Sequence, residues 1–141
     1  MISFFLPFGD AVRSGNRDQL MMPGEAWLYG RIEGQAFVSA MSVALVKLLG
    51  KSGYRAIAPS CSGDFYTTSE PDENGLSFTS NWSERHAAYA CGLGTFGLSK
   101  GLITERGMAG RFGSIITDLP WNRLREPIQA YTIFASAAEP A

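Results

Sequence analysis

The stretch "CGLGTFGLSKGLI", Cys91–Ile103, holds three glycines in the spacing G-x-G-x-x-G: Gly92, Gly94 and Gly97. A dinucleotide fingerprint places its first glycine after a strand and its last at the start of a helix, whose free N–H groups face the pyrophosphate. Here the order is reversed, because a helical pattern precedes Gly92 and a strand pattern follows Gly97. We interpret the segment as a helix end followed by a tight turn at Gly94 and Gly97, whose bare backbone would admit a flat ligand.

The sequence on either side of the glycines predicts a helix and then a β-hairpin. Asn81 or Ser80 is the expected helix cap, and Glu84 stands at the capping-box position three residues after Asn81. The helix is expected to run to about Cys91. Downstream, "GLIT" and "RFGSIITDL" predict two paired strands joined by the loop "ERGMAG".

The N-terminal half predicts a strand, a long helix and a second strand. Residues 2–8 form an apolar run typical of a buried strand, and the polar, turn-rich segment 12–25 predicts a loop. Apolar residues from Ala26 to Leu49 recur at helical spacing, although two internal glycines favour a start near Gln35. With "YRAIAPS" as a short strand, this is one βαβ-like unit, and we expect a single-domain α/β (α+β) fold.

Composition limits the classes of partner. The chain has 141 residues, 45% of them hydrophobic and 18% charged, with a net charge of −1, so nothing favours binding to nucleic acid or to an anionic membrane. No apolar run approaches the ~20 residues of a membrane span, and a basic leader is lacking, so the predicted location is the cytoplasm. Two cysteines make neither a disulfide framework nor a four-thiolate metal site. The polar stretch 63–81 is the longest predicted loop.

The segment "SERHAAYACGLGTFGLSKGLITERGMAGRFGSIITDLP", Ser83–Pro120, resembles the catalytic domain of epoxyqueuosine reductase and its relatives. These are corrinoid and iron–sulfur proteins of the reductive-dehalogenase superfamily. Their pattern is a Glu-Arg pair, a helix, G-L-G-x-x-G, a short strand and a G-S-x-x-T-D-L strand. The matching residues are Glu84, Arg85, Gly92, Leu93, Gly94, Gly97, Gly113, Ser114, Thr117, Asp118 and Leu119.

The resemblance implies a nitroreductase-like domain, with a mixed sheet flanked by helices, that holds base-off cobalamin in a cleft. Electrons would come from two 4Fe–4S clusters in a C-terminal ferredoxin module. The residues expected at the cofactor include the Glu-Arg pair, which we expect to form an ion pair bracing the helix; the full set is Glu84, Arg85, Gly92, Gly94, Thr95 and Gly97.

The sequence departs from the tRNA-modifying enzymes of that family at two positions. Phe78 stands where those enzymes have an Asp that serves as general acid, and Leu98 stands where they have Lys, with Lys100 two positions later. Phe78 has no proton to give. We therefore assign no catalytic residue and no metal ligand, and expect a divergent subfamily.

The tail 127–141 lacks the cysteines that follow the T-D-L strand in the family, which divides the chain into a domain at 1–126 and an atypical tail. Every alanine codon begins GC, and a preceding T makes TGC, a cysteine codon. Read one base back after Pro127, the allowed codons can spell Tyr-Thr-Gly-Ile-Tyr-Asp-Phe-Cys-x-x-Cys-Gly-x-Cys, with the cysteines at Ala135, Ala138 and Ala141. We hypothesise an out-of-frame reading of a ferredoxin module; codon degeneracy alone is the alternative, and the nucleotide sequence distinguishes the two.

Other reactive side chains carry less information. His86 is the only histidine and is interpreted as a solvent-facing or capping residue. Cys91 is interpreted as a small buried residue, and the role of Cys61 is not assigned. Tyr66 and Tyr89 are candidate proton donors, because dehalogenating relatives use a Tyr.

Our leading interpretation is a corrinoid-dependent iron–sulfur reductase domain, incomplete and inactive by itself because the electron-delivery module is absent. One alternative is a non-enzymatic α/β binding or dimerisation module, favoured by Phe78 and the cysteine-free tail. Another is a flavin nitroreductase-like enzyme that works as an obligate dimer. The expected partners are a second copy of the chain and a small-molecule or tetrapyrrole ligand, with neither membrane nor nucleic acid.

Overall fold

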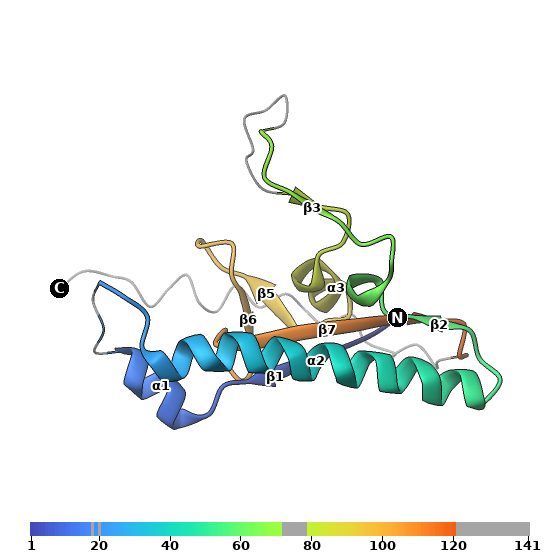
Figure 1. Ribbon diagram of the computed structural model, residues 1–141, viewed down its shortest axis with the longest axis horizontal. Coiled ribbons are helices and arrows are strands. Elements are labelled where there is room, and N and C mark those ends of the chain that lie inside the picture. The colour runs from blue at the N-terminus through green and yellow to red at the C-terminus, as the bar shows by residue number, and fades with distance from the viewer. Residues whose placement is uncertain (18, 20, 72–78, 121–141) are drawn as a thin grey trace.

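The computed structural model describes residues 1–17, 19, 21–71 and 79–120, which form one α+β domain (Figure 1). Phe78 and the predicted tail 127–141 lie outside the described residues. The elements follow in the order β1 (Ile2–Pro7), α1 (Asp10–Arg17), α2 (Glu25–Lys51), β2 (Ala56–Ile57), the 3-10 helix η1 (Pro59–Cys61), β3 (Thr67–Thr68), β4 (Thr79–Ser80), α3 (Glu84–Ala90), β5 (Gly94–Phe96), β6 (Leu102–Thr104) and β7 (Gly110–Thr117).

The central sheet has the strand order β1-β7-β2, so the last strand lies between the first two. Ile2 to Pro7 pair with Ile115 to Gly110, and Ala56–Ile57 pair with Thr117 and Ile116, both antiparallel. Because β1 and β2 both run antiparallel to β7, they run parallel to each other, and β1–α2–β2 is a split βαβ unit. The predicted βαβ-like unit is confirmed, whereas the predicted mixed sheet is wrong: every pairing between the described strands is antiparallel.

α2 covers one face of this sheet (Figure 1). Its buried side chains are Val38 and Ser42. A Cβ on Gly113 of β7 would stand 2.8 Å from Cγ1 of Val38 and closer still to the ring of Phe4, so only a glycine lets the helix pack at this depth. The helix begins at Glu25 rather than near Gln35, because its internal glycines lie where α2 meets Phe8, and packing overrides their low helix propensity.

The opposite face of the sheet carries α3, and the β5–β6 hairpin packs on α3 through β5. Since successive residues of a strand point to opposite faces, Ser114 points away from α2. Its hydroxyl is fully buried and accepts a hydrogen bond from Nε1 of Trp82 at 3.0 Å, which fixes the chain just before α3. On the same face, Phe5 and Phe112 stack with ring centroids 4.6 Å apart.

Two predictions about local structure are wrong. Segment 12–25 was expected as a loop, but Asp10–Arg17 is helical, held by an Asp10–Arg13 ion pair and by packing on α2. The predicted pairing of 102–104 with 110–117 does not occur: β6 pairs with β5, whereas β7 pairs with β1 over 110–115 and with β2 at Ile116 and Thr117. The β-bridge between Thr104 and Gly107 turns the chain away before β7 begins.

The described part of the predicted loop 63–81 is an arm that projects from the body, with the short β3–β4 ladder along it (Figure 1). Asn81 stabilises its base: its side-chain oxygen accepts from the N–H of Tyr66 at 3.1 Å and its amide donates to the carbonyl of Asp64 at 2.8 Å. Asn81 therefore braces the arm and does not cap α3.

α2 is long and apolar enough to cross a membrane by length and composition, with a mean hydropathy of 1.4 over 18 residues. This differs from the expectation that no run approaches a span. The core helix of a soluble protein meets the same criterion, but only 11% of this window is buried. Much of α2 is therefore both apolar and exposed.

Candidate functional site

The first turn of α3 places Glu84 and Arg85 on different neighbours. Ser83 caps the helix by accepting a hydrogen bond from the N–H of His86, so the predicted caps Asn81 and Ser80 are wrong by two to three residues. The Arg85 guanidinium donates to the carbonyl of Lys100 at 2.8 Å. The Glu84 carboxylate turns to η1 instead, so the expected Glu84–Arg85 ion pair is not formed.

The Glu84 carboxylate is held on one side and free on the other. Ser60 Oγ donates to Glu84 Oε1 at 2.6 Å. Glu84 Oε2 is buried and has no hydrogen-bond partner among the residues that the structure describes. A buried acceptor left unpaired costs about 1–3 kcal/mol. This oxygen is therefore an unused acceptor beneath the surface, which a ligand N–H or O–H reaches only if the residues that cover it move.

The end of α3 uses the backbone donors that were expected to face a ligand. Gly92 has φ +76°, as a left-handed residue after a helix requires. Its N–H donates to the carbonyl of Tyr89, and the N–H of Leu93 donates to that of Ala88, both at 2.9 Å. These two bonds form a Schellman motif. The helix end at Gly92 is confirmed, but its N–H groups close the helix.

Gly94 lies in a strand and not in the predicted turn. A Cβ at Gly94 would stand 2.2 Å from the carbonyl oxygen of Ile103 on the paired strand β6. Thr95 pairs with Ile103, and the turn of the hairpin begins at Gly97, whose carbonyl accepts from Lys100 and whose N–H donates to Gly101. The side of Gly94 that would cradle a ligand is filled by backbone of the neighbouring strand.

The second half of the motif links β7 to β2. Asp118 accepts from the backbone N–H and from Nε of Arg55, both at 2.8 Å, and the Thr117 hydroxyl donates to the carbonyl of Arg55 at 2.9 Å. The hydrogen bond from Arg55 lowers the pKa of Asp118 below its ordinary value. These motif residues thus act as clamps on the sheet edge.

Other sequence candidates lie along α3. His86 stands 2.7 Å from Ser83 Oγ through Nδ1, and its ring lies 5.0 Å from that of Phe96, as expected for a residue beside the cap. Tyr89 also meets Phe96, with centroids 5.5 Å apart. Burial raises the pKa of the Cys91 thiol, so this side chain is a poor nucleophile. Tyr66 is exposed on the arm.

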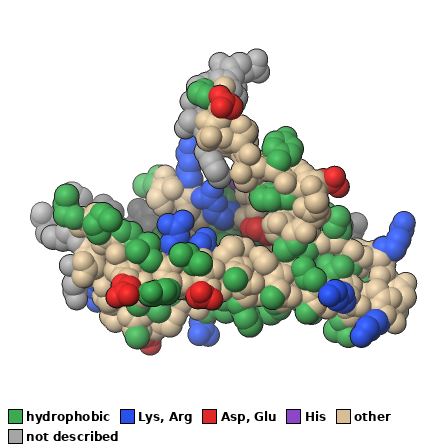
Figure 2. Space-filling model, viewed as in Figure 1, with side chains coloured by type: hydrophobic (Ala, Val, Ile, Leu, Met, Phe, Trp, Pro, Cys, Tyr) green, Lys and Arg blue, Asp and Glu red, His purple; other side chains and the backbone are tan. Residues whose placement is uncertain are grey.

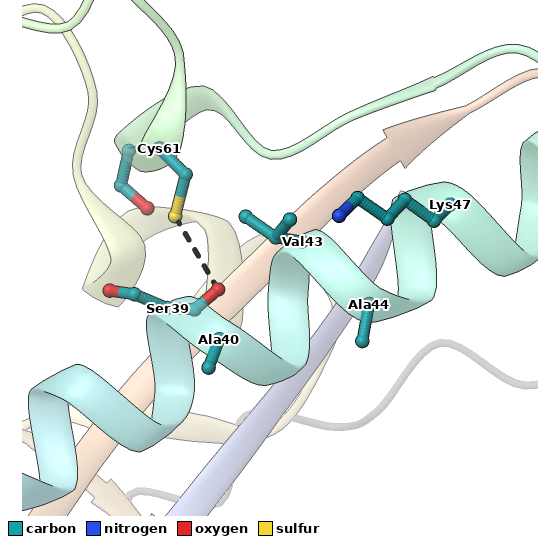
Figure 3. A pocket seen from close by; sticks show the side chains of 7 residues that line it. Ser39, Ala40, Val43, Ala44, Lys47 and Cys61 are labelled. Atoms are coloured by element: carbon teal, nitrogen blue, oxygen red, sulfur yellow. Dashed lines mark hydrogen bonds between the residues drawn. The ribbon is translucent and has the colours of Figure 1, made fainter.

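A groove of about 530 Å³ lies between α2 and η1, and the sequence pattern did not predict it (Figure 3). Cys61 points across it to the carbonyl of Ser39, with Sγ 3.9 Å away. Ser60, which holds Glu84, lies at its edge, and the motif therefore reaches the groove only through this serine. The lining residues are Ser39, Ala40, Val43, Ala44, Lys47, Ser60 and Cys61.

The residues present fit the two implied cofactors differently. A 4Fe–4S cluster needs four thiolates, the chain holds two cysteines, and no group of three or more His, Cys, Asp or Glu gathers within the described ranges. The clusters do not fit. A corrinoid carries amide N–H groups at its rim, and the unused Glu84 Oε2 suits such a donor. Glu84, rather than the glycine backbone, is the motif residue whose chemistry suits a corrinoid amide, but its Oε2 is buried and Glu84 does not line the groove.

No protein-family model, curated protein or solved structure matches the chain.

Proposed function

We propose that this chain is part of the catalytic domain of a corrinoid-dependent reductase related to epoxyqueuosine reductase, with a nitroreductase-like form of the α+β fold. The residue pattern from Ser83 to Pro120 supports this. Its members Ser114 and Asp118 anchor the chain before α3 and the chain before β2 to β7, through the bonds to Trp82 and Arg55. The chain has no thiolate set for iron–sulfur clusters. In this proposal the electrons come from iron–sulfur clusters outside residues 1–141, and these residues by themselves do not turn over.

The observation that carries the proposal is the buried, unpaired Oε2 of Glu84. When bound, a corrinoid supplies a cobalt ion that passes electrons to a substrate. The protein's part is to bind and orient. Once the residues that cover it move aside, Glu84 Oε2 would accept an amide N–H of the ligand. Ser60 fixes the carboxylate through Oε1, and Trp82 holds the start of α3 against β7.

Titration of the purified chain with hydroxocobalamin, followed by visible absorbance, tests this proposal. We expect a base-off shift. Glu84→Gln should weaken binding by about tenfold to a hundredfold, since a hydrogen bond to a charged group is worth about 1.5–3 kcal/mol. With Ser60 donating to the amide oxygen, the glutamine NH2 would face the ligand's own donors. Glu105→Gln, at an exposed turn, is the matched control and should bind as the wild type does.

The outcomes separate the three interpretations. An unchanged cobalamin spectrum refutes the proposal. A yellow preparation that releases flavin on denaturation favours the nitroreductase-like alternative. A colourless protein that responds to neither cofactor favours the non-enzymatic module. Circular dichroism of Glu84→Gln separates lost binding from lost folding.

A further inference from the structure

α2 presents an apolar face to solvent on the side away from the sheet (Figure 2). We call this the outer face. Tyr29 is 59% exposed and Ile32 is 68% exposed, both well above what a core helix shows. Its apolar members recur at helical spacing and are Tyr29, Ile32, Ala36, Ala40, Val43 and Ala44. A helix that is apolar on both sides is normally buried on both sides.

The elements that pack against α2 are α1, β2, β7 and η1. These meet the side that carries Val38 and Ser42 and its flanks. Among residues 1–17, 19, 21–71 and 79–120, no helix or strand packs over the outer face of α2 in the way that these four elements pack over its opposite side. A continuous exposed apolar patch of this kind marks an interaction surface.

The charges on the outer face are separated by sign along the helix. Glu25 and Glu33 lie in its N-terminal half, and Lys47 and Lys51 lie in its C-terminal half, all four exposed. A second α2 running antiparallel places its basic half against the acidic half of the first. The two helix dipoles then also point in opposite directions, so that the positive end of each lies beside the negative end of the other, which favours this packing. A lipid bilayer offers no such complement and would bury charges without partners.

We propose that the outer face of α2 is a homodimer interface, in which two copies pack their α2 helices antiparallel about a twofold axis. The axis lies where Ala36 of one copy faces Ala40 of the other, and small side chains there allow the helices to approach closely. This register sets Glu25 opposite Lys51. The contact follows the 27 residues of α2, about 40 Å of helix.

The groove beside η1 belongs to the same interface. Ala40, Val43 and Ala44 are common to the groove and the outer face. A twofold axis across the helices keeps each flank on its own side, so Ile32 of the second copy comes beside Val43 and fills the groove. The groove is therefore a receptor for an aliphatic side chain of a second copy.

Sedimentation of the full chain without detergent tests the proposal. We expect a species of twice the 15.3 kDa chain mass. Ala40→Glu places an unpaired carboxylate in the interface and should weaken dimerisation tenfold or more. Ala11→Glu makes the same change on an exposed position of α1 and should leave the dimer intact.

A charge exchange tests the antiparallel register even if Ala40→Glu misfolds. Glu25→Lys should weaken the dimer by placing two basic side chains opposite each other at each end of the interface, and adding Lys51→Glu should restore it. A monomeric wild type at about 100 µM protein, roughly a hundred-thousandfold above a nanomolar Kd, overturns the proposal. A dimer that Ala40→Glu leaves unchanged also overturns the proposal. The same holds if the wild type partitions into phosphatidylcholine vesicles and Ala40→Glu abolishes that partitioning.

Discussion

Replacing Gly94 with alanine tests whether this glycine serves the hairpin or a ligand. The added Cβ would stand 2.2 Å from the carbonyl oxygen and 2.8 Å from the carbonyl carbon of Ile103. An ordinary C···O contact is about 3.3 Å or more, so β5 and β6 must separate by about 1 Å. The obstacle is backbone and cannot rotate away. We expect a loss of about 3 kcal/mol, the upper end of the range for overpacking.

Two further alanine substitutions separate the effects that a glycine can have. Gly107 has open space around it but φ +85°, so Gly107→Ala should cost about 1–2 kcal/mol from backbone strain alone. Gly50 has neither a close neighbour nor a positive φ, and Gly50→Ala in the last turn of α2 should stabilise by about 0.5–1 kcal/mol.

Thermal unfolding of the ligand-free protein measures all three. For a chain of this size, Gly94→Ala should lower the Tm by roughly 10 °C, more than Gly107→Ala does. If Gly94→Ala melts at or above the temperature of Gly107→Ala, the backbone contact with Ile103 does not limit this position, and the ligand-binding role expected from the sequence regains its basis.

Two other substitutions test the anchors of the motif. Ser83→Ala removes the cap of α3 and should cost about 1 kcal/mol in urea unfolding; an unchanged midpoint would mean that another group caps the helix. Asp118, whose pKa is lowered by Arg55, should stabilise the fold above its ordinary pKa of 3.8 and lose that contribution as pH falls through the lower folded value. The Tm difference between wild type and Asp118→Asn should therefore shrink from pH 7 to pH 3, and a difference independent of pH would contradict the pairing with Arg55.

Elements with strong local signals were predictable from the sequence. The apolar run at the N-terminus predicted the bounds of β1 to within one residue. The glycine after the helical pattern predicted the end of α3 at Gly92. The long apolar repeat gave α2, although its start needed the tertiary contact of its glycines with Phe8. These features depend on neighbours a few residues apart, which is the range over which sequence patterns are informative.

Features that depend on distant residues were not predictable. The partner of β6 was misassigned because β5 and β7 are equally near to it in sequence and the glycines of β5 were interpreted as a turn. β7 pairs instead with β1, more than a hundred positions earlier. The motif glycines suggested a surface for a ligand, yet position 94 requires glycine because a side chain there would collide with the carbonyl oxygen of Ile103. The groove arises only when η1 is laid against α2, and the Ser60–Glu84 bond spans 24 residues.

The pairing of β1 with β7 has a consequence for synthesis of the protein. Ile2 to Pro7 are synthesised more than a hundred residues before their hydrogen-bonding partners, Ile115 to Gly110. At typical elongation rates the interval is roughly 5–20 seconds. Throughout that time the nascent chain displays "ISFFLP" with both edges open, which is the kind of segment that aggregates or recruits chaperones. Yield in the cell should thus depend on how well this hexapeptide is shielded during translation.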